Sequence, residues 1–356
     1  MKKLLLIDFG AVWGGQEIYS RSIAQVLVER GWCVTSVSMH ERHAVDGVRF
    51  LPVSIGYKDF VGNKRLIEDM LPSYDVVHFN GIRAIYLAAI LKHSKPFVGT
   101  KHLPYSSLEQ VTVRSWLARL GSHVVFHNLD RLISISEKTL VELPLDVQRR
   151  SSVVLNGVSD MGGALAVLPN EAELTVCFVG RFVEHKGMMR LLAAVALLRQ
   201  QQVSVKVLLA GGGPLEQTAR EFVASNHLLE AVEFLGYVES PADVFQRAHV
   251  CALPSLHEGL PLSLLEALSA HCALLGHDIP GVRDVINDGV NGLIAAISAE
   301  SIADKLRTLA QNRSLLGKLR QNAREDYEKN WRLDRMVDET VEIYNRAVST
   351  FEHRNR

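Results

Sequence analysis

Short apolar runs alternate with amphipathic stretches along this chain of 356 residues. Apolar runs of about four to eight residues predict buried strands, and apolar residues spaced three and four apart predict helices with one covered face. In the first half, the pattern predicts strands near residues 3–8, 33–38, 48–53, 75–79, 96–100 and 131–135, and helices near residues 16–30, 64–71, 82–92, 108–120 and 136–143. This alternation is typical of a parallel sheet covered by helices on both faces.

The same alternation restarts after residue 171. It predicts strands near residues 174–180, 204–210, 231–235, 249–254, 272–276 and 292–295, and helices near residues 188–201, 214–226, 241–247, 262–270, 282–286, 299–311 and 313–327. Residues 156–171 contain three Gly and few large apolar side chains, so they form the expected linker. We therefore expect an α/β protein of two doubly wound domains, 1–155 and 172–330, with the ligand in the cleft between them.

Bulk composition narrows the class of protein. The net charge is zero, with a mild basic excess before residue 160 and a matching acidic excess after it, which is far from the footprint of a nucleic-acid partner. The apolar run at residues 4–7 stops at Asp8, too early for a signal peptide, and no apolar stretch approaches the ~18–20 residues that span a bilayer. The four cysteines lack metal-type or redox-type spacing, which predicts buried thiols and a reducing cytoplasm.

Residues 254–267 carry the most specific chemistry. Glu258 is expected in a loop and Glu266 inside the helix that follows, with Pro261 suited to its first turn. Carboxylates only accept hydrogen bonds, so this pair suits ligands with neighbouring hydroxyls, such as a hexose or a ribose diol. The backbone amides of Gly259 and Leu260 add donors for an anion or an oxygen.

Residues 178–187 provide positive charge. An apolar strand end is followed by a loop with Arg181 and Lys186, and then by a predicted helix. Cations at the carboxyl end of a strand, facing a helix N-terminus, form a phosphate site, and the planar Arg complements the point charge of Lys. The competing interpretation is that these cations, and the two acids above, are solvated surface groups.

The two segments together closely resemble family 4 of the retaining glycosyltransferases of the GT-B fold, whose signature is this Arg…Lys loop followed by Glu-x7-Glu. The resemblance extends in the expected order to Trp13-Gly14-Gly15-Gln16-Glu17, Thr100-Lys101-His102, Ile133-Ser134-Ile135-Ser136, Leu155-Asn156-Gly157-Val158 and Gly236-Tyr237-Val238. It implies two facing Rossmann-like domains, an interdomain cleft and a C-terminal helix, within residues 331–356, that crosses back to the first domain. One departure is Ser269-Ala270-His271-Cys272-Ala273-Leu274, where the family commonly has Ala-x-Gly-x-Pro-Val, so we expect an unusual donor-side loop.

The resemblance also implies roles for individual residues. Glu258, with Gly259, Leu260 and Pro261, would bind the transferred sugar, and Glu266 would bind the ribose diol. The backbone of Tyr237 and Val238 would meet the nucleobase, and His102 would lie beside the donor sugar unless it is an ordinary core or surface histidine. Gly14 and Gly15 would contact the diphosphate or the acceptor, or simply form a strand-to-helix turn.

The implied activity is metal-independent, retaining transfer of a hexose from a UDP- or GDP-sugar to a glycan or lipid-linked glycan, in surface polysaccharide or lipopolysaccharide synthesis. No Asp-x-Asp occurs, so we expect no metal and no cofactor, with Arg181, Lys186 and helix N-termini stabilising the leaving diphosphate. The alternatives are a GT-B sugar-nucleotide epimerase or hydrolase, and a non-catalytic sugar-nucleotide-binding partner of another transferase.

Residues 109–126 suggest how the protein could reach a lipid-linked acceptor. A helix there would set Val113, Trp116, Leu117 and Leu120 near one face, with Arg114, Arg119 and His123 close by. This pattern predicts peripheral binding to the anionic inner face of the membrane, although ordinary packing of a domain helix explains it equally well.

Overall fold

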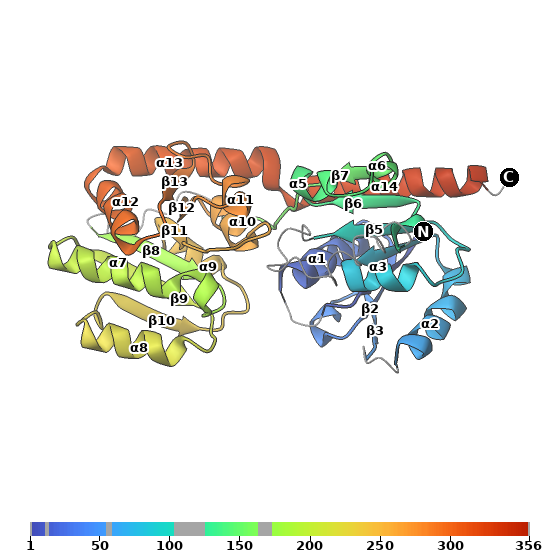
Figure 1. Cartoon of the computed structure of the whole chain (residues 1–356), viewed down its shortest axis with the longest axis horizontal. Helices are drawn as coiled ribbons and strands as arrows, with labels where there is room; N and C mark the ends of the chain where they lie inside the picture. Colours follow the sequence, from blue (N-terminus) through green and yellow to red (C-terminus); the bar gives the residue numbers. More distant parts are fainter. Residues whose placement is uncertain (1, 11–13, 55–58, 103–124, 163–172, 355–356) are drawn as a thin grey trace. The chain divides into compact units, whose positions relative to one another are not determined.

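The structure, a computed structural model, describes residues 2–10, 14–54, 59–102, 125–162 and 173–354. The chain divides into two compact units, which we call the N-terminal unit (Met1–Gly157 with Leu333–Arg356) and the C-terminal unit (Val158–Arg332). Each unit contains one parallel sheet with helices packed on it (Figure 1). The predicted α/β class with two doubly wound sheets is confirmed.

The sheet of the N-terminal unit has seven parallel strands in the order β3-β2-β1-β4-β5-β6-β7. Its described elements are β1 (Lys3–Asp8), α1 (Gly15–Glu29), β2 (Cys33–Ser38), β3 (Arg49–Pro52), α2 (Asp59–Met70), β4 (Val76–Asn80), α3 (Ile82–Ala88), β5 (Phe97–Lys101), β6 (Arg131–Ser134), α5 (Glu137–Val141), α6 (Leu145–Gln148), β7 (Ser151–Val153) and α14 (Leu333–Arg354).

Strand β1 shows why its sequence is an unbroken apolar run. Successive side chains of a strand point to opposite faces of the sheet. Leu5 and Ile7 pack into the core on one face, while Leu4 and Leu6 pack into the core on the other. A strand covered on both faces needs apolar residues at every position, so the run ends where the strand ends, at Asp8.

Helix α14 completes the N-terminal unit, as the resemblance implied. Met336, Val337 and Tyr344 are buried in the same core as Leu4 and Leu6. In Figure 1 this helix, in red, lies beside β6 of the unit that the N-terminal residues form.

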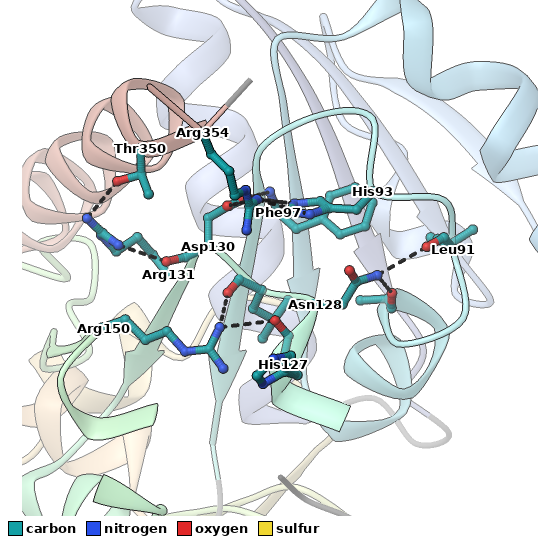
Figure 2. Close-up of polar contacts among 12 residues, drawn as sticks. Leu91, His93, Phe97, His127, Asn128, Asp130, Arg131, Arg150, Thr350 and Arg354 are labelled. Atoms are coloured by element: carbon teal, nitrogen blue, oxygen red, sulfur yellow. Dashed lines mark hydrogen bonds and ion pairs between the residues drawn. The ribbon is translucent and has the colours of Figure 1, made fainter. Parts of the chain in front are cut away.

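The end of α14 is also held by polar contacts (Figure 2). The Arg354 guanidinium donates to Asp130 Oδ1 at 2.6 Å, and Arg131 donates to Thr350 Oγ1 at 2.7 Å. Asp130 is fully buried and also accepts from His93 Nε2 and the Phe97 amide, each at 2.8 Å. These contacts fix the helix at the edge of the sheet where β5 and β6 begin.

The C-terminal unit has six parallel strands in the order β10-β9-β8-β11-β12-β13. Its described elements are β8 (Leu174–Val179), α7 (Met188–Gln200), β9 (Val205–Ala210), α8 (Glu216–Ser225), β10 (Val232–Gly236), α9 (Ala242–Gln246), β11 (Val250–Leu253), α10 (Leu262–Ser269), β12 (Ala273–His277), α11 (Pro280–Arg283), β13 (Gly292–Ala295), α12 (Ala299–Gln311) and α13 (Arg313–Asp326). Cys177, Cys251 and Cys272 are buried free thiols in it, as predicted, whereas Cys33 of the N-terminal unit is only half-buried.

The structure corrects several predicted boundaries and adds two elements. Helix α2 begins at Asp59 rather than near 64, α3 ends at Ala88 rather than near 92, and α11 spans Pro280–Arg283 rather than 282–286. Strand β7 and helix α6 were not predicted, because three and four residues are too short to show a period. The helix predicted at 108–120 and most of the linker predicted at 156–171 lie outside the described residues.

Candidate functional site

The charged centre of the C-terminal unit is an ion pair between Lys186 and Glu258. Lys186 Nζ donates to Glu258 Oε1 at 2.6 Å and to Oε2 at 2.8 Å. The Lys186 side chain is 20% exposed and that of Glu258 only 8%. The predicted cationic loop after β8 and the predicted acidic loop after β11 therefore meet, although the two residues are 72 positions apart.

Gly187 allows these two loops to approach. It has φ +80, in the left-handed region, and a Cβ atom there would lie 1.9 Å from the carbonyl oxygen of Pro254. A side chain at this position would clash with the Pro254 backbone, so the backbone of one of the two loops would have to shift.

Ser255 is a member of this centre that sequence reasoning missed. Its side chain is fully buried, and its hydroxyl donates to Glu258 Oε1 at 2.6 Å and lies 3.4 Å from the Lys186 carbonyl oxygen. The only signal in the sequence was its position, two residues after the strand that ends at Leu253 and three residues before Glu258.

Glu266 contrasts with Glu258. It lies within α10, and its carboxylate makes no hydrogen bond or ion pair with any residue that the structure describes. Burial raises the pKa of Glu266 to about 7. A half-buried carboxylate without a partner is costly to the fold, and a hydroxylated ligand would relieve that cost.

Further groups of the C-terminal unit are open to a ligand. Arg181 is exposed and has no side-chain partner among the described residues. The amides of Gly259 and Leu260 likewise donate to no described residue. Pro261 is the N-cap of α10 and directly precedes its first helical residue, Leu262.

Tyr237 and Val238 follow β10. Tyr237 is 65% exposed, Val238 is half-buried, and Gly236 before them has φ +68. These residues therefore lie in a partly exposed turn, and the contact with a nucleobase that the resemblance implies for them stays a prediction.

The sequence departure after α10 concerns His271. Its φ of 59 lies in the left-handed region, the conformation for which glycine is favoured. The turn before β12 is thus of the type that a glycine would form, with a histidine in place of the family's glycine.

In the N-terminal unit, His102 follows β5. Its Nε2 lies 2.7 Å from Asn80 Oδ1, and its ring meets the edge of Tyr19 with ring centroids 4.9 Å apart. Burial lowers the pKa of His102 to about 4, so the ring is neutral at physiological pH.

Gly14 is the N-cap of α1, and Gly15 is its first residue. The Gly14 amide donates to Glu17 Oε2 at 2.8 Å, so it is already occupied within the chain. Glu17 belongs to the same sequence motif but was given no role of its own. Burial, and next the charge of Asp8, raise the pKa of Glu17 to about 7. The neighbouring Trp13 lies outside the described residues.

Among the described residues, no three His, Cys, Asp or Glu side chains are grouped so as to hold a metal ion. Over the same ranges, no helix combines the length and the apolar character needed to cross a membrane.

Comparison with known families agrees with the fold. The family model described as glycosyltransferase family 4 matches residues 13–160, and the model described as glycosyl transferases group 1 matches residues 166–326. The chain belongs to the family 4 glycosyltransferases of the GT-B fold, and it is a glycosyltransferase.

Individual relatives are distant. An uncharacterized glycosyltransferase of Methanocaldococcus jannaschii is 25% identical over 81% of this chain and 82% of its own length. The GalNAc-α-(1→4)-GalNAc-α-(1→3)-diNAcBac-PP-undecaprenol α-1,4-N-acetyl-D-galactosaminyltransferase of Campylobacter jejuni is 32% identical over 44% of each chain. The crystal structure of Anabaena HepE in complex with UDP and glucose has a TM-score of 0.78 at 17% identity, covering 96% of this chain and 99% of its own, which shows a shared fold.

Proposed function

We propose that the chain is a metal-independent, retaining hexosyltransferase that moves a sugar from a UDP- or GDP-sugar to a glycan or lipid-linked glycan. The observation that carries this proposal is the unequal satisfaction of the two carboxylates, Glu258 and Glu266. Each carboxylate oxygen offers two lone pairs. Oε1 of Glu258 already accepts from Lys186 and Ser255, and Oε2 accepts from Lys186. Glu258 therefore has one acceptor position left, whereas Glu266 has all four.

These open positions match the two parts of a nucleotide sugar. Glu266 can accept from both hydroxyls of a ribose diol, and Glu258 can accept from one hydroxyl of the transferred sugar. Lys186 uses two of its three N–H groups on Glu258, which leaves one for a phosphate oxygen. Arg181 and the amides of Gly259 and Leu260 supply further donors.

The proposed reaction follows from these positions. The bond between the anomeric carbon and the diphosphate oxygen breaks, and its electron pair goes to that oxygen. Lys186 and Arg181 stabilise the charge that develops there. The acceptor hydroxyl forms the new bond on the same face of the sugar, and its proton passes to the departing phosphate, so no protein base takes part. His102 contacts a hydroxyl of the bound substrate as a neutral ring.

A donor screen tests this function. UDP-, GDP-, ADP- and dTDP-sugars are added separately, and the midpoint of thermal unfolding is measured. A donor present at about 100 times its dissociation constant adds about 2.7 kcal/mol to the free energy of unfolding. The matched donor is then incubated with candidate acceptors, and NMR of the product identifies the anomer. An inverted anomer would overturn the retaining mechanism, and release of free sugar and UDP without a glycan would favour a hydrolase.

The same assay in EDTA tests the absence of a metal requirement. We expect unchanged turnover, because Lys186 and Arg181 provide the charge that a divalent ion supplies elsewhere. Loss of activity that Mg²⁺ or Mn²⁺ restores would refute the metal-free mechanism.

The acceptor proposal is supported by two observations. The Campylobacter jejuni relative is named for a glycan linked to undecaprenol through PP. Residues 109–126 combine apolar and basic side chains at helical spacing. We expect the chain to co-sediment with anionic vesicles and to detach as salt rises, and Arg114→Glu with Arg119→Glu to abolish this without affecting nucleotide binding. Absence of vesicle binding at low salt would favour a soluble acceptor and remove the peripheral-membrane assignment.

A further inference from the structure

Three polar residues stand at the carboxyl ends of three adjacent strands of the N-terminal unit. Asp8 ends β1, Asn80 ends β4, and His102 directly follows β5. The strand order β1-β4-β5 and the register, in which Asp8 pairs with Asn80 and Asn80 with Thr100, bring the three side chains into a row. Asp8 and Asn80 are fully buried, so each hydrogen-bonding atom there needs a defined partner.

The partners of Asn80 fix the orientation of its amide. One end of the amide lies 2.9 Å from Asp8 Oδ2 and 3.0 Å from the backbone oxygen of Gln16. A carboxylate and a carbonyl are acceptors only, so this end must be the NH₂ group. Oδ1 of Asn80 therefore faces His102 Nε2, at 2.7 Å, and requires a donor there.

We propose that Asp8 and Asn80 are positioning residues that hold His102 as the tautomer protonated at Nε2, so that its Nδ1 is an acceptor for one hydroxyl of the bound substrate. The proposal rests on the function given above, in which His102 contacts that hydroxyl. Nδ1 has no hydrogen-bond partner among the described residues, so none of them occupies this acceptor.

Asp8 is itself held in place. Its Oδ1 accepts from the Gly10 amide at 3.0 Å and from Gln16 Nε2 at 2.8 Å, and its Oδ2 accepts from the Ser20 hydroxyl as well as from Asn80. These donors come from the loop after β1 and from α1, so the row is anchored before a ligand arrives. The lowered pKa of His102 agrees with a ring that accepts a hydrogen bond rather than one that carries charge.

The tautomer is measured by ¹⁵N NMR on the full chain labelled at histidine, without substrate. The His102 signals are assigned by their loss in His102→Gln. We expect a protonated Nε2 and an unprotonated Nδ1 in the wild type, and a mixture of the two tautomers in Asn80→Ala. The control is Asn128→Ala, which removes hydrogen bonds to the Ala88 and Leu91 carbonyls (Figure 2). Asn128 lies just before the start of β6, whereas His102 lies after the end of β5. We expect this control to leave the His102 signals unchanged.

A double-mutant cycle with the matched donor then links the tautomer to substrate. We expect Asn80→Ala to lower kcat/KM about tenfold, the equivalent of one misplaced hydrogen bond. In the double mutant with His102→Gln, Asn80→Ala should lower kcat/KM little further, because both changes remove the same acceptor.

A proton on Nδ1 in the wild type, an unchanged tautomer in Asn80→Ala, or fully additive losses would each overturn the proposal. The NMR spectrum does not depend on catalysis. An inactive protein with the expected tautomer would contradict the proposed function, whereas an active protein with the other tautomer would contradict this inference. If Asn80→Ala does not fold, the wild-type spectrum alone still decides the tautomer.

Discussion

The polar residues at the candidate sites of the two units differ in whether the chain itself provides their hydrogen-bond partners. In the N-terminal unit, Asp8, Asn80 and His102 satisfy one another in a chain of hydrogen bonds. In the C-terminal unit, Arg181 and Glu266 have no side-chain partner among the residues that the structure describes. The network of Asp8, Asn80 and His102 leaves a single acceptor, His102 Nδ1, for a ligand. The unpaired groups of Arg181 and Glu266 can instead bind a ligand that carries its own charge and hydrogen-bond donors. If the proposed function holds, we expect the C-terminal unit to supply most of the binding energy for a charged donor.

The largest expected effect comes from Lys186→Ala. We expect turnover to fall about 10²–10³-fold, since its charge matters most as the diphosphate departs, while binding of the free nucleoside changes little. Initial rates and nucleoside titration measure the two quantities. Lys206→Ala is the control, because Lys206 pairs with Glu233 at the surface of the same unit. Wild-type turnover in Lys186→Ala would end the assignment of this residue.

Gly187→Ala tests whether loop geometry, and not only charge, makes the centre. The added methyl meets the Pro254 carbonyl at 1.9 Å in a backbone region that disfavours Ala. We expect the free energy of unfolding to fall by about 2 kcal/mol, together with a loss of turnover. In Gly317→Ala the methyl meets no atom within 4 Å on α13, so this variant should gain about 0.5–1 kcal/mol. Equal stability of the two variants would contradict the role given to Gly187.

The division of labour between the two acids is tested by the pH dependence of nucleotide binding. Because the pKa of Glu266 is raised to about 7, its carboxyl gains a proton as pH falls through 7 and loses acceptor capacity. We expect UDP or GDP affinity to fall by up to about tenfold per pH unit below 7. Calorimetry should show weaker and less pH-dependent binding in Glu266→Gln, and near-normal binding of free nucleotide in Glu258→Gln. Equal losses in both variants would show that the roles are wrongly divided.

The smallest effect concerns stability without ligand. Glu266 has a folded pKa above its unfolded value, so its contribution is fully present below about 4.5 and is lost as pH rises through 7. Glu266→Gln should therefore be more stable than the wild type at pH 8 and no more stable at pH 4.5. Thermal melts at the two pH values measure this, with the exposed Glu230→Gln as control. A destabilised Glu266→Gln at pH 8 would mean that the carboxylate has a partner in the fold.

Much of the fold follows from apolar periodicity, because long buried strands such as β1 leave a continuous signal. The short edge strand β7 does not, since half-buried Ser151 and Ser152 resemble a loop. In the site, charge and context single out Lys186 and Glu258 separately. Their ion pair depends on the approach of two loops at Gly187, which local sequence does not encode.

Ser255 and Asn80 were missed for a related reason. They are neutral, and their importance comes from the charged or aromatic groups that tertiary structure places beside them. The available signal was their place at or just after the end of a buried strand.

Because α14 packs on the N-terminal unit, the two units complete their folding in a different order from the one in which they are translated. The C-terminal unit is continuous in sequence and is fully available once Arg332 has left the ribosome. The N-terminal unit is translated first, yet one of its cores includes Met336, Val337 and Tyr344. Until those residues emerge, the surface of its sheet that α14 covers stays open to chaperones and to aggregation. The part of this protein that is made first is therefore the last to be completed.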